Sequence, residues 1–386
     1  MPYCLQFCAE SVVIQCESAI IFQHAQRLTG AIRVGINHPQ HVLILKHAAF
    51  YNRLRPHMPE VMPGVHRIEI DYNGRPLKLT LLLGAQANVL LDAGDASTPD
   101  KDILPYFAKI GFDPKRLTHI IATHPDLDHT GGLARMHEVA PNALICCGDE
   151  DKEQCATPES LIDLRYRAHL YWHGLGVSDE AKPKILPRCG GPVPIHQTFK
   201  GGERIQLSAD KHVEILHLPG HSYGHLGFYL PDENAAIIAD AVHHRANFFS
   251  DGRAAFACTY MYVDLYLSTI DKLRLMKLDR LYSCHWPDLL SNNTINKWLD
   301  ESRDYALHAE AAILDTLRAA NDGGLTLREV CLQAKPKLGA WPVEKDLETR
   351  SMACGHLQRL VSRGLVRMTD DRPTRYIAEK EWRGLR

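Results

Sequence analysis

The sequence predicts an α+β protein in which strands and helices both contribute to the core. Runs of continuous or alternating apolar residues predict strands, and apolar residues at helical spacing predict helices between and after them. Four strand-like runs are followed by histidine or aspartate. After residue 298 the pattern changes to three helical segments and two short strands. These observations predict a large mixed domain followed by a small, mainly helical one.

Composition limits the class of protein. The chain has 386 residues, enough for two or three domains, and 45% of them are hydrophobic, which is ample for a large core. A net charge of −2 at pH 7 does not favour a nucleic-acid or membrane surface. The 11 cysteines are scattered and form no C-x-x-C pair, which argues against a disulfide framework and against a thiolate zinc site. Reduced thiols are the simplest account of these cysteines, so we expect a cytoplasmic protein. No apolar run of membrane-spanning length occurs, so we expect no membrane segment.

The N-terminal part differs from the rest of the chain. Residues 1–61 show no clear periodicity and are predicted to form a poorly ordered extension. From residue 63 the pattern sharpens, because residues 65–72 alternate, Asn73-Gly74 predicts a hairpin turn and residues 77–83 return as a strand. Residues 88–92 predict a third strand, residues 101–110 a helix and residues 117–122 a buried strand.

The segment T-H-P-D-L-D-H-T-G-G at residues 123–132 carries two imidazoles and two carboxylates within six positions. Histidine and carboxylate side chains bind first-row divalent metals without the help of cysteine. Further histidine and aspartate residues follow later strand-like runs. The candidate metal ligands are His124, Asp126, Asp128, His129, His221, Asp240 and His285. Their convergence from four elements predicts a metal site rather than an ordinary polar loop.

This set of motifs resembles the metallo-β-lactamase superfamily, whose metal motif is H-x-H-x-D-H followed by separate His, Asp and His ligands. The resemblance covers about residues 62–298, and implies an αββα sandwich with two face-to-face sheets, helices outside and metals at one sheet edge. It implies a first metal held by His124, Asp126 and His221, and a second held by Asp128, His129 and His285. Asp240 would bridge the two metals.

One position departs from the family pattern, because Asp126 stands where the family usually has histidine. Zinc is the expected metal, but this anionic oxygen ligand leaves iron and manganese open. Whether Asp126 reaches a metal is also open, since the side chain of aspartate is short.

The resemblance also implies supporting residues. Asp92, in L-D-A-G at residues 91–94, is expected to support the metal site, with a simple turn residue as the alternative. His225, in G-H-S-Y-G-H at residues 220–225, is expected to brace it from behind. Tyr223 is a candidate hydroxyl donor to a developing oxyanion, and Asp128 is expected to orient the attacking water.

Residues 150–197 are an insertion between the ligand motifs, and we interpret them as a cap over the metal face. Residues 158–175 predict a helix rich in aromatic groups. The alternative is a helix that only packs its aromatic residues. Arg165 either meets a substrate anion or stays solvated. The expected substrate-pocket residues are Tyr166, His169, Trp172 and His243.

The tail at residues 301–386 has an order of elements that resembles a winged helix. Residues 306–320, 326–333 and 348–363 predict helices, and residues 364–368 and 375–377 predict strands. Arg350, Arg359 and Arg363 lie on the third helix and could face phosphates. Acidic residues nearly balance the basic ones, which favours a structural or homodimer-forming role over nucleic-acid binding.

The resemblance implies that two divalent metal ions activate a water that attacks a small-molecule ester, lactone or thioester. The alternative is a nuclease or phosphodiesterase that acts on RNA or DNA through the winged-helix tail. A diiron redox protein is less favoured because no flavodoxin-like domain is present. A non-catalytic binding module is also less favoured, because every ligand position carries a competent residue.

Overall fold

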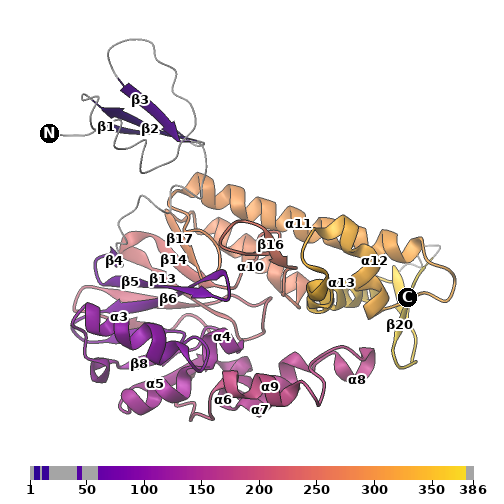
Figure 1. Cartoon of the computed structure of the whole chain (residues 1–386), viewed down its shortest axis with the longest axis horizontal. Coiled ribbons are helices and arrows are strands. Elements are labelled where there is room, and N and C mark those ends of the chain that lie inside the picture. The colour runs from indigo at the N-terminus through magenta and orange to yellow at the C-terminus, as the bar shows by residue number, and fades with distance from the viewer. Residues whose placement is uncertain (1–3, 9–10, 17–40, 46–59, 380–386) are drawn as a thin grey trace. The chain divides into compact units, whose positions relative to one another are not determined.

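The computed structural model describes residues 4–8, 11–16, 41–45 and 60–379, which divide into two compact units (Figure 1). The first unit contains an antiparallel sheet of β1 (Cys4–Cys8), β2 (Ser11–Cys16) and β3 (His41–Leu45). The predicted poorly ordered extension at residues 1–61 falls largely outside the described residues and stays a prediction.

The second unit contains a seven-stranded mixed sheet in the order β10-β9-β8-β7-β6-β5-β4. The strands β4 to β7 pair antiparallel, and β7 to β10 pair parallel. Asn73 and Gly74 have positive φ angles of 56° and 76°, as a tight hairpin turn requires, and they join β5 to β6 as predicted. The strands are β4 (Glu60–Met62), β5 (Val65–Tyr72), β6 (Arg75–Leu83), β7 (Asn88–Leu91), β8 (His119–Ile121), β9 (Leu144–Gly148) and β10 (Gln197–Phe199).

A five-stranded sheet in the order β11-β12-β13-β14-β17 packs against the first sheet. Val89 and Ile121 of one sheet share a buried core with Ile215, Phe228 and Ile237 of the other. The strands are β11 (Arg204–Gln206), β12 (His212–His217), β13 (Leu226–Leu230), β14 (Ala235–Ala239) and β17 (Arg280–Ser283). A separate hairpin consists of β15 (Asn247–Phe248) and β16 (Ala254–Phe256).

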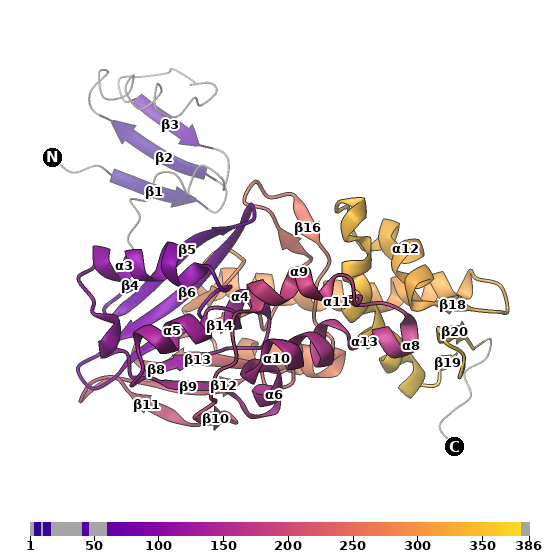
Figure 2. The same ribbon diagram turned by 60° about the horizontal axis from the view of Figure 1, so that its bottom comes forward.

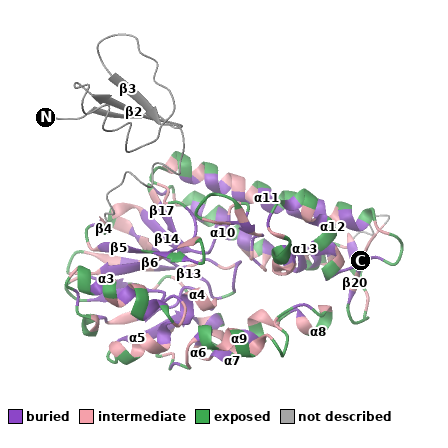
Figure 3. Ribbon diagram, viewed as in Figure 1, coloured by how far each residue is buried: buried purple, intermediate pink, exposed green. Residues whose placement is uncertain are grey.

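Helices cover the outer face of each sheet (Figures 1 and 2). The seven-stranded sheet packs against α3 (Leu104–Lys109) and α5 (Leu133–Val139), and the five-stranded sheet packs against α10 (Val263–Leu275) and α11 (Asn292–Arg318). Buried residues follow the strands and the inner sides of these helices (Figure 3). The two sheets with helices outside confirm the predicted architecture.

The insertion at residues 150–197 is a chain of short helices. The helical character predicted for residues 158–175 is present at 158–166 and 170–173, but it does not form one continuous helix. The backbone leaves helical geometry around Arg167 and His169, and Gly174 ends α8 with a φ of 65°. The helices are α6 (Lys152–Ala156), α7 (Pro158–Leu161), η4 (Ile162–Tyr166), α8 (Leu170–His173) and α9 (Lys182–Ile185). Further short helices are η1 (Pro99–Ile103), η2 (Pro114–Arg116), α4 (Leu127–Thr130), η3 (Asp149–Asp151), η5 (Leu186–Cys189), η6 (Pro231–Glu233) and η7 (Val343–Thr349).

The C-terminal part contains three helices and a small sheet in the order β18-β20-β19. Helix α11 begins at Asn292 and runs through the predicted domain boundary at residue 300, and its Leu299 shares a core with Leu357 of α13. The division into residues 62–300 and 301–386 stays a prediction. The elements after α11 are β18 (Leu325–Thr326), α12 (Leu327–Leu338), α13 (Arg350–Ser362), β19 (Val366–Met368) and β20 (Arg375–Ala378). Within the described residues, no helix combines the length and apolar character needed to cross a bilayer.

Candidate metal centre

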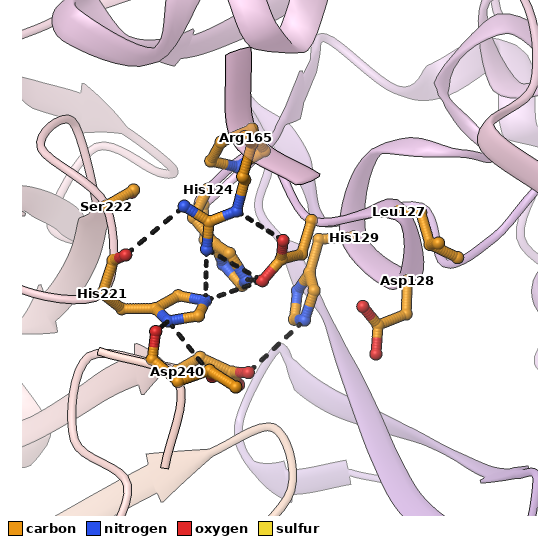
Figure 4. Close-up of polar contacts among 12 residues, drawn as sticks. His124, Leu127, Asp128, His129, Arg165, His221, Ser222 and Asp240 are labelled. Atoms are coloured by element: carbon orange, nitrogen blue, oxygen red, sulfur yellow. Dashed lines mark hydrogen bonds and ion pairs between the residues drawn. The ribbon is translucent and has the colours of Figure 1, made fainter. Parts of the chain in front are cut away.

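The seven predicted ligands lie together beyond the carboxyl ends of four strands. His124 follows β8, and Asp126, Asp128 and His129 lie on the turn that forms α4. His221 follows β12, Asp240 follows β14 and His285 follows β17. They form overlapping clusters in which the potential ligand atoms lie within 4.8 Å of one another: His124–Asp126–His221, Asp128–His129–His285 and His124–His129–Asp240. Figure 4 shows His124, Asp128, His129, His221 and Asp240 of these clusters.

The second predicted cluster has the donor set of a metal site. His285 Nε2 lies 3.6 Å from Asp128 Oδ2 and 3.4 Å from Asp240 Oδ2, and His129 Nε2 lies 3.8 Å from Asp240 Oδ2. His129 Nε2 and Asp240 Oδ1 are buried and have no hydrogen-bond partner among the described residues. Buried polar atoms without a partner are costly, and a divalent cation would satisfy them. These residues therefore fit a metal ion.

Asp92 orients His129 from the side opposite the cluster. Its Oδ2 lies 2.8 Å from His129 Nδ1, and its Oδ1 accepts a hydrogen bond of 2.8 Å from the Thr123 amide. Asp92 has a φ of 64°, a conformation that costs energy in a non-glycine residue and is typical of functional sites. Burial alone would lower the pKa of His129, but the charge of Asp92 and this hydrogen bond raise it to about 10. Asp92 therefore contacts a candidate ligand, and its role in supporting a metal site stays a prediction.

The first predicted cluster is occupied by a side chain from the cap. Arg165, in η4, donates from Nε to Asp126 Oδ1 at 2.5 Å and from Nη2 to Asp126 Oδ2 at 2.9 Å. The same Nη2 lies 2.9 Å from His221 Nε2, and Nη1 donates to the His221 carbonyl at 3.3 Å. Figure 4 shows the Arg165 guanidinium directed toward His221.

This contact changes what the first cluster can hold. Burial alone would raise the pKa of Asp126, but the adjacent Arg165 guanidinium holds it well below its usual range. A metal ion at this cluster would need the same Asp126 oxygens and the same His221 nitrogen, and it would meet a second positive charge at hydrogen-bonding distance. With Arg165 in this position the first cluster does not fit a metal, whereas the second does.

Two further histidines pack behind the ligands. His225 stacks on His124 with 4.9 Å between ring centroids, and it is completely buried. His243 lies 4.7 Å from His221 by the same measure and packs against Trp286. His243 has no exposed surface, and its predicted role in the substrate pocket stays a prediction.

The other predicted residues lie in different places. The Tyr166 hydroxyl accepts a hydrogen bond of 2.8 Å from the Leu127 amide, at the edge of the metal turn. Tyr223 is 49% exposed, and its ring lies against Tyr262 with 3.7 Å between centroids. His169 and Trp172 contact the C-terminal part of the chain, as Arg372 over the Trp172 ring shows. Their roles in catalysis or substrate binding stay predictions.

Residues 220–224 read G-H-S-Y-G, which has the spacing of a serine-hydrolase nucleophile turn. The structure does not support that role. Ser222 is buried and donates its hydroxyl hydrogen bond to Asp151, and strand β13 rather than a helix follows the segment. Ser222 therefore anchors the loop that carries His221.

Arg165 and Arg75 are charged residues of the site that the sequence did not assign to it. Arg75 Nη2 lies 3.7 Å from Asp128 Oδ2. No spacing rule connects either arginine to the ligand motif. Asp126 itself could have indicated a nearby cation, because a buried carboxylate in place of a histidine is stabilised by an adjacent positive charge.

Comparison with known proteins agrees with this geometry. The model of the metallo-beta-lactamase superfamily matches residues 79–285, more than half of the chain. A hydroxyacylglutathione hydrolase from Hyphomonas neptunium is 25% identical over 48% of this chain and 71% of its own length. The acyl-coenzyme A thioesterase MBLAC2 from Gallus gallus is 25% identical over 44% of this chain and 59% of its own length, so the chain matches less than two thirds of that relative.

Solved structures share the fold over a longer range. A metallo-beta-lactamase family protein from Thermus thermophilus matches with a TM-score of 0.65 at 20% identity, covering 83% of this chain and all of that chain. A beta-lactamase domain protein from Burkholderia ambifaria matches with a TM-score of 0.64 at 16% identity, covering 83% of this chain and 93% of that one. These likenesses extend beyond the range of the family model and concern the fold alone.

Proposed function

The chain belongs to the metallo-β-lactamase superfamily and is one of its hydrolases, and we propose that it cleaves small-molecule thioesters. Esters and lactones are chemically related alternatives. The observation that carries the proposal is the buried cluster of Asp128, His129 and His285 with Asp240, whose free donor atoms fit a metal ion. Zinc is the proposed metal, with iron or manganese as alternatives.

A metal held there would lower the pKa of a bound water and supply a nucleophile near neutral pH. The residues of the chain contribute orientation and charge. Asp128 points its Oδ2 toward both His285 and Arg75, at 3.6 and 3.7 Å, which positions a carboxylate to accept a hydrogen bond from the attacking water. His129 is held in place by Asp92.

We propose that Arg165 provides the positive charge that a first metal would supply in a two-metal site. Its guanidinium is largely buried, with 10% of the side chain exposed, and it cannot lose its proton under physiological conditions. A fixed cation at a water-poor site stabilises charge that develops on a carbonyl oxygen. The catalytic centre would then contain one metal ion and one arginine, in place of the two ions that the family resemblance implies.

The thioester class is supported by the relatives. Both curated relatives described above carry names of enzymes that act on thioesters, a hydroxyacylglutathione hydrolase and an acyl-coenzyme A thioesterase. Their identity of 25% and partial coverage make the substrate a proposal for this chain. A cytoplasmic location is proposed as well.

The phosphodiesterase alternative depends on the C-terminal part. Its order of helices and strands, with the sheet β18-β20-β19, supports a winged-helix interpretation. However, Arg359 and Arg363 pair with Glu310, and Arg350 pairs with Glu348, so the arginines of α13 already have carboxylate partners. These pairs favour a structural or homodimer-forming role for the tail.

A substrate panel tests the proposal. Purified full-length protein, stripped with a chelator and reloaded with zinc, manganese or iron, would be assayed against an acyl-glutathione, an acyl-coenzyme A, an aryl ester, a lactone and a bis-aryl phosphodiester. We expect turnover of at least one thioester, with a rate at least tenfold lower in His285→Gln. Turnover of the phosphodiester alone would overturn the proposal.

A further inference from the structure

A second group of metal-binding residue types lies outside the site described above. His169 and His173, at the two ends of α8, and Cys354 of α13 each place one ligand atom within 4.8 Å of the others. Cys354 Sγ lies 3.8 Å from His173 Nε2. Two imidazoles and one thiol are a donor set suited to zinc-class divalent ions.

Both imidazoles carry an unpaired nitrogen inside the protein. His169 is 6% exposed, and its Nε2 has no hydrogen-bond partner among the described residues. His173 Nδ1 also lacks a partner there, whereas the His173 nitrogen that faces Cys354 is Nε2. The spacing of four residues places the two rings on one side of a helical turn. Burial, with Arg350 and His173 adding to it, lowers the pKa of His169 to about 4, so the ring is neutral and keeps a lone pair. Neutral imidazole is the form that binds metals.

We propose that His169, His173 and Cys354 bind a zinc-class divalent ion, with water as the fourth ligand. Binding breaks the S–H bond of Cys354 and releases that proton to solvent, while both histidines bind without losing a proton. Arg350 lies near enough to oppose the ion's charge, and the Cys354 thiolate offsets this effect. Because binding releases the thiol proton, metal affinity should increase with pH.

The ion would fasten the cap to the C-terminal part. Helix α8 already contacts the β19–β20 turn, since the Thr374 amide donates to the Trp172 carbonyl at 2.9 Å and Arg372 stacks 4.0 Å from the Tyr171 ring centroid. His173 also stacks on Tyr376 of β20, with 5.9 Å between ring centroids. Arg165 lies in η4, just before α8 in the chain. A metal at α8 would therefore help to hold the segment that places Arg165 against Asp126.

Metal content measured on full-length variants tests the inference. Protein dialysed against excess zinc and then against metal-free buffer would be analysed by mass spectrometry for wild type, Cys354→Ser and the more exposed site variant His173→Gln. Cys331→Ser is the matched control, because Cys331 is equally buried on the neighbouring helix α12. We expect each site variant to hold about one zinc less than wild type, and Cys331→Ser to hold the same amount.

Cobalt gives a second readout that does not depend on the zinc count. Cobalt-loaded wild type should show a thiolate-to-cobalt charge-transfer band that disappears in Cys354→Ser. Cys284→Ser controls for the catalytic centre, because Cys284 lies near Asp92 and His129, and it should keep the band. Equal zinc content in all four proteins, or a band that survives Cys354→Ser and is lost in Cys284→Ser, would overturn the inference. If Cys354→Ser does not fold, the zinc content and the cobalt spectrum of His173→Gln test the inference instead.

Discussion

The guanidinium of Arg165 forms a two-point ion pair with the carboxylate of Asp126, with 2.5 Å from Nε to Oδ1 and 2.9 Å from Nη2 to Oδ2. Paired hydrogen bonds of this kind are among the strongest polar contacts in proteins. The pair joins the cap to the metal turn and occupies the cluster at which the family resemblance places a first metal. It explains why an aspartate is accommodated at this position of the motif.

Removing the charge of Arg165 should open the first cluster. In Arg165→Met, Asp126 loses its cation, and His221 Nε2 keeps only the Asp126 carboxylate, 2.8 Å away, as its partner. His124, Asp126 and His221 can then act as ligands. We expect zinc content to rise by about one equivalent per chain and hydrolysis to fall at least tenfold.

Arg167→Met is the matched control for this variant. Arg167 lies two residues away and pairs with Asp179, whose side chain is 83% exposed. It should change neither zinc content nor rate. A folded Arg165→Met protein with the zinc content of wild type would contradict the one-metal assignment.

Asp92 should control metal affinity through His129. Asp92→Asn keeps the size of the side chain but removes the charge that orients the imidazole. We expect zinc affinity, measured by competition with a chromophoric chelator, to fall about 10- to 100-fold. Asp100→Asn, a change in an exposed carboxylate on η1, should leave the affinity unchanged. Equal affinity in Asp92→Asn and wild type would show that Asp92 is only a turn residue.

Much of the fold and the ligand set could be predicted from the sequence because both depend on local patterns. The strand at Val65–Tyr72 agrees with the predicted range residue for residue. The predicted metal ligands follow strands. Because the ends of neighbouring strands meet at one edge of a sheet, these ligands were expected to lie close together. Arg165 could not be assigned in the same way, since its partner Asp126 is 39 residues away and no periodicity relates the cap to the metal turn.

The cap illustrates a second limit. Residues 158–175 have helical composition, but they form α7, η4 and α8, with non-helical backbone angles at Arg167 and His169 before α8. The cluster of His169, His173 and Cys354 could not be predicted from the sequence either, because Cys354 is 181 residues from His173 in the chain. Spacing rules identify metal sites whose ligands are close in sequence. In this cluster only the two histidines are close in sequence.

Gly132 should be essential for the metal turn to pack. A Cβ at this position would lie 2.1 Å from the Ala93 carbonyl oxygen, which belongs to the backbone and cannot move aside easily. We expect Gly132→Ala to lower the free energy of unfolding by about 1–3 kcal/mol. Gly111→Ala is a useful comparison for space alone, because a Cβ there would meet nothing within 4 Å, although its φ of 68° adds some backbone strain. Equal loss in the two variants, measured by urea unfolding, would contradict the close-contact explanation.

Glu310 should stabilise the C-terminal helices in a pH-dependent way. Burial alone would raise its pKa, but hydrogen bonds and charge from His356 and Arg359 lower it to about 2. A carboxyl group with a lowered folded-state pKa stabilises the fold above its unfolded pKa and loses this effect as pH falls toward the folded pKa. We expect Glu310→Gln to lower the free energy of unfolding at pH 7 by about 1–2 kcal/mol, since solvent partly screens the pairs.

The difference between wild type and Glu310→Gln should shrink as pH falls from about 4.5 to about 2. Denaturant unfolding at a series of pH values measures it. Glu344→Gln, an exposed carboxylate on η7, should show no comparable difference at any pH. A difference that is constant through the acid range would mean that Glu310 stabilises the helices by packing alone.

The most direct measurement of the central claim is thioester hydrolysis as zinc is added back to chelator-stripped protein. To keep the cluster at α8 out of the count, the titration would use His173→Gln. The rate should rise linearly and reach a plateau at about one zinc per chain, and His285→Gln in the same background should stay near the stripped rate. A plateau at two zinc ions would contradict the role assigned to Arg165, and full activity without any metal would contradict the metal-dependent hydrolase itself.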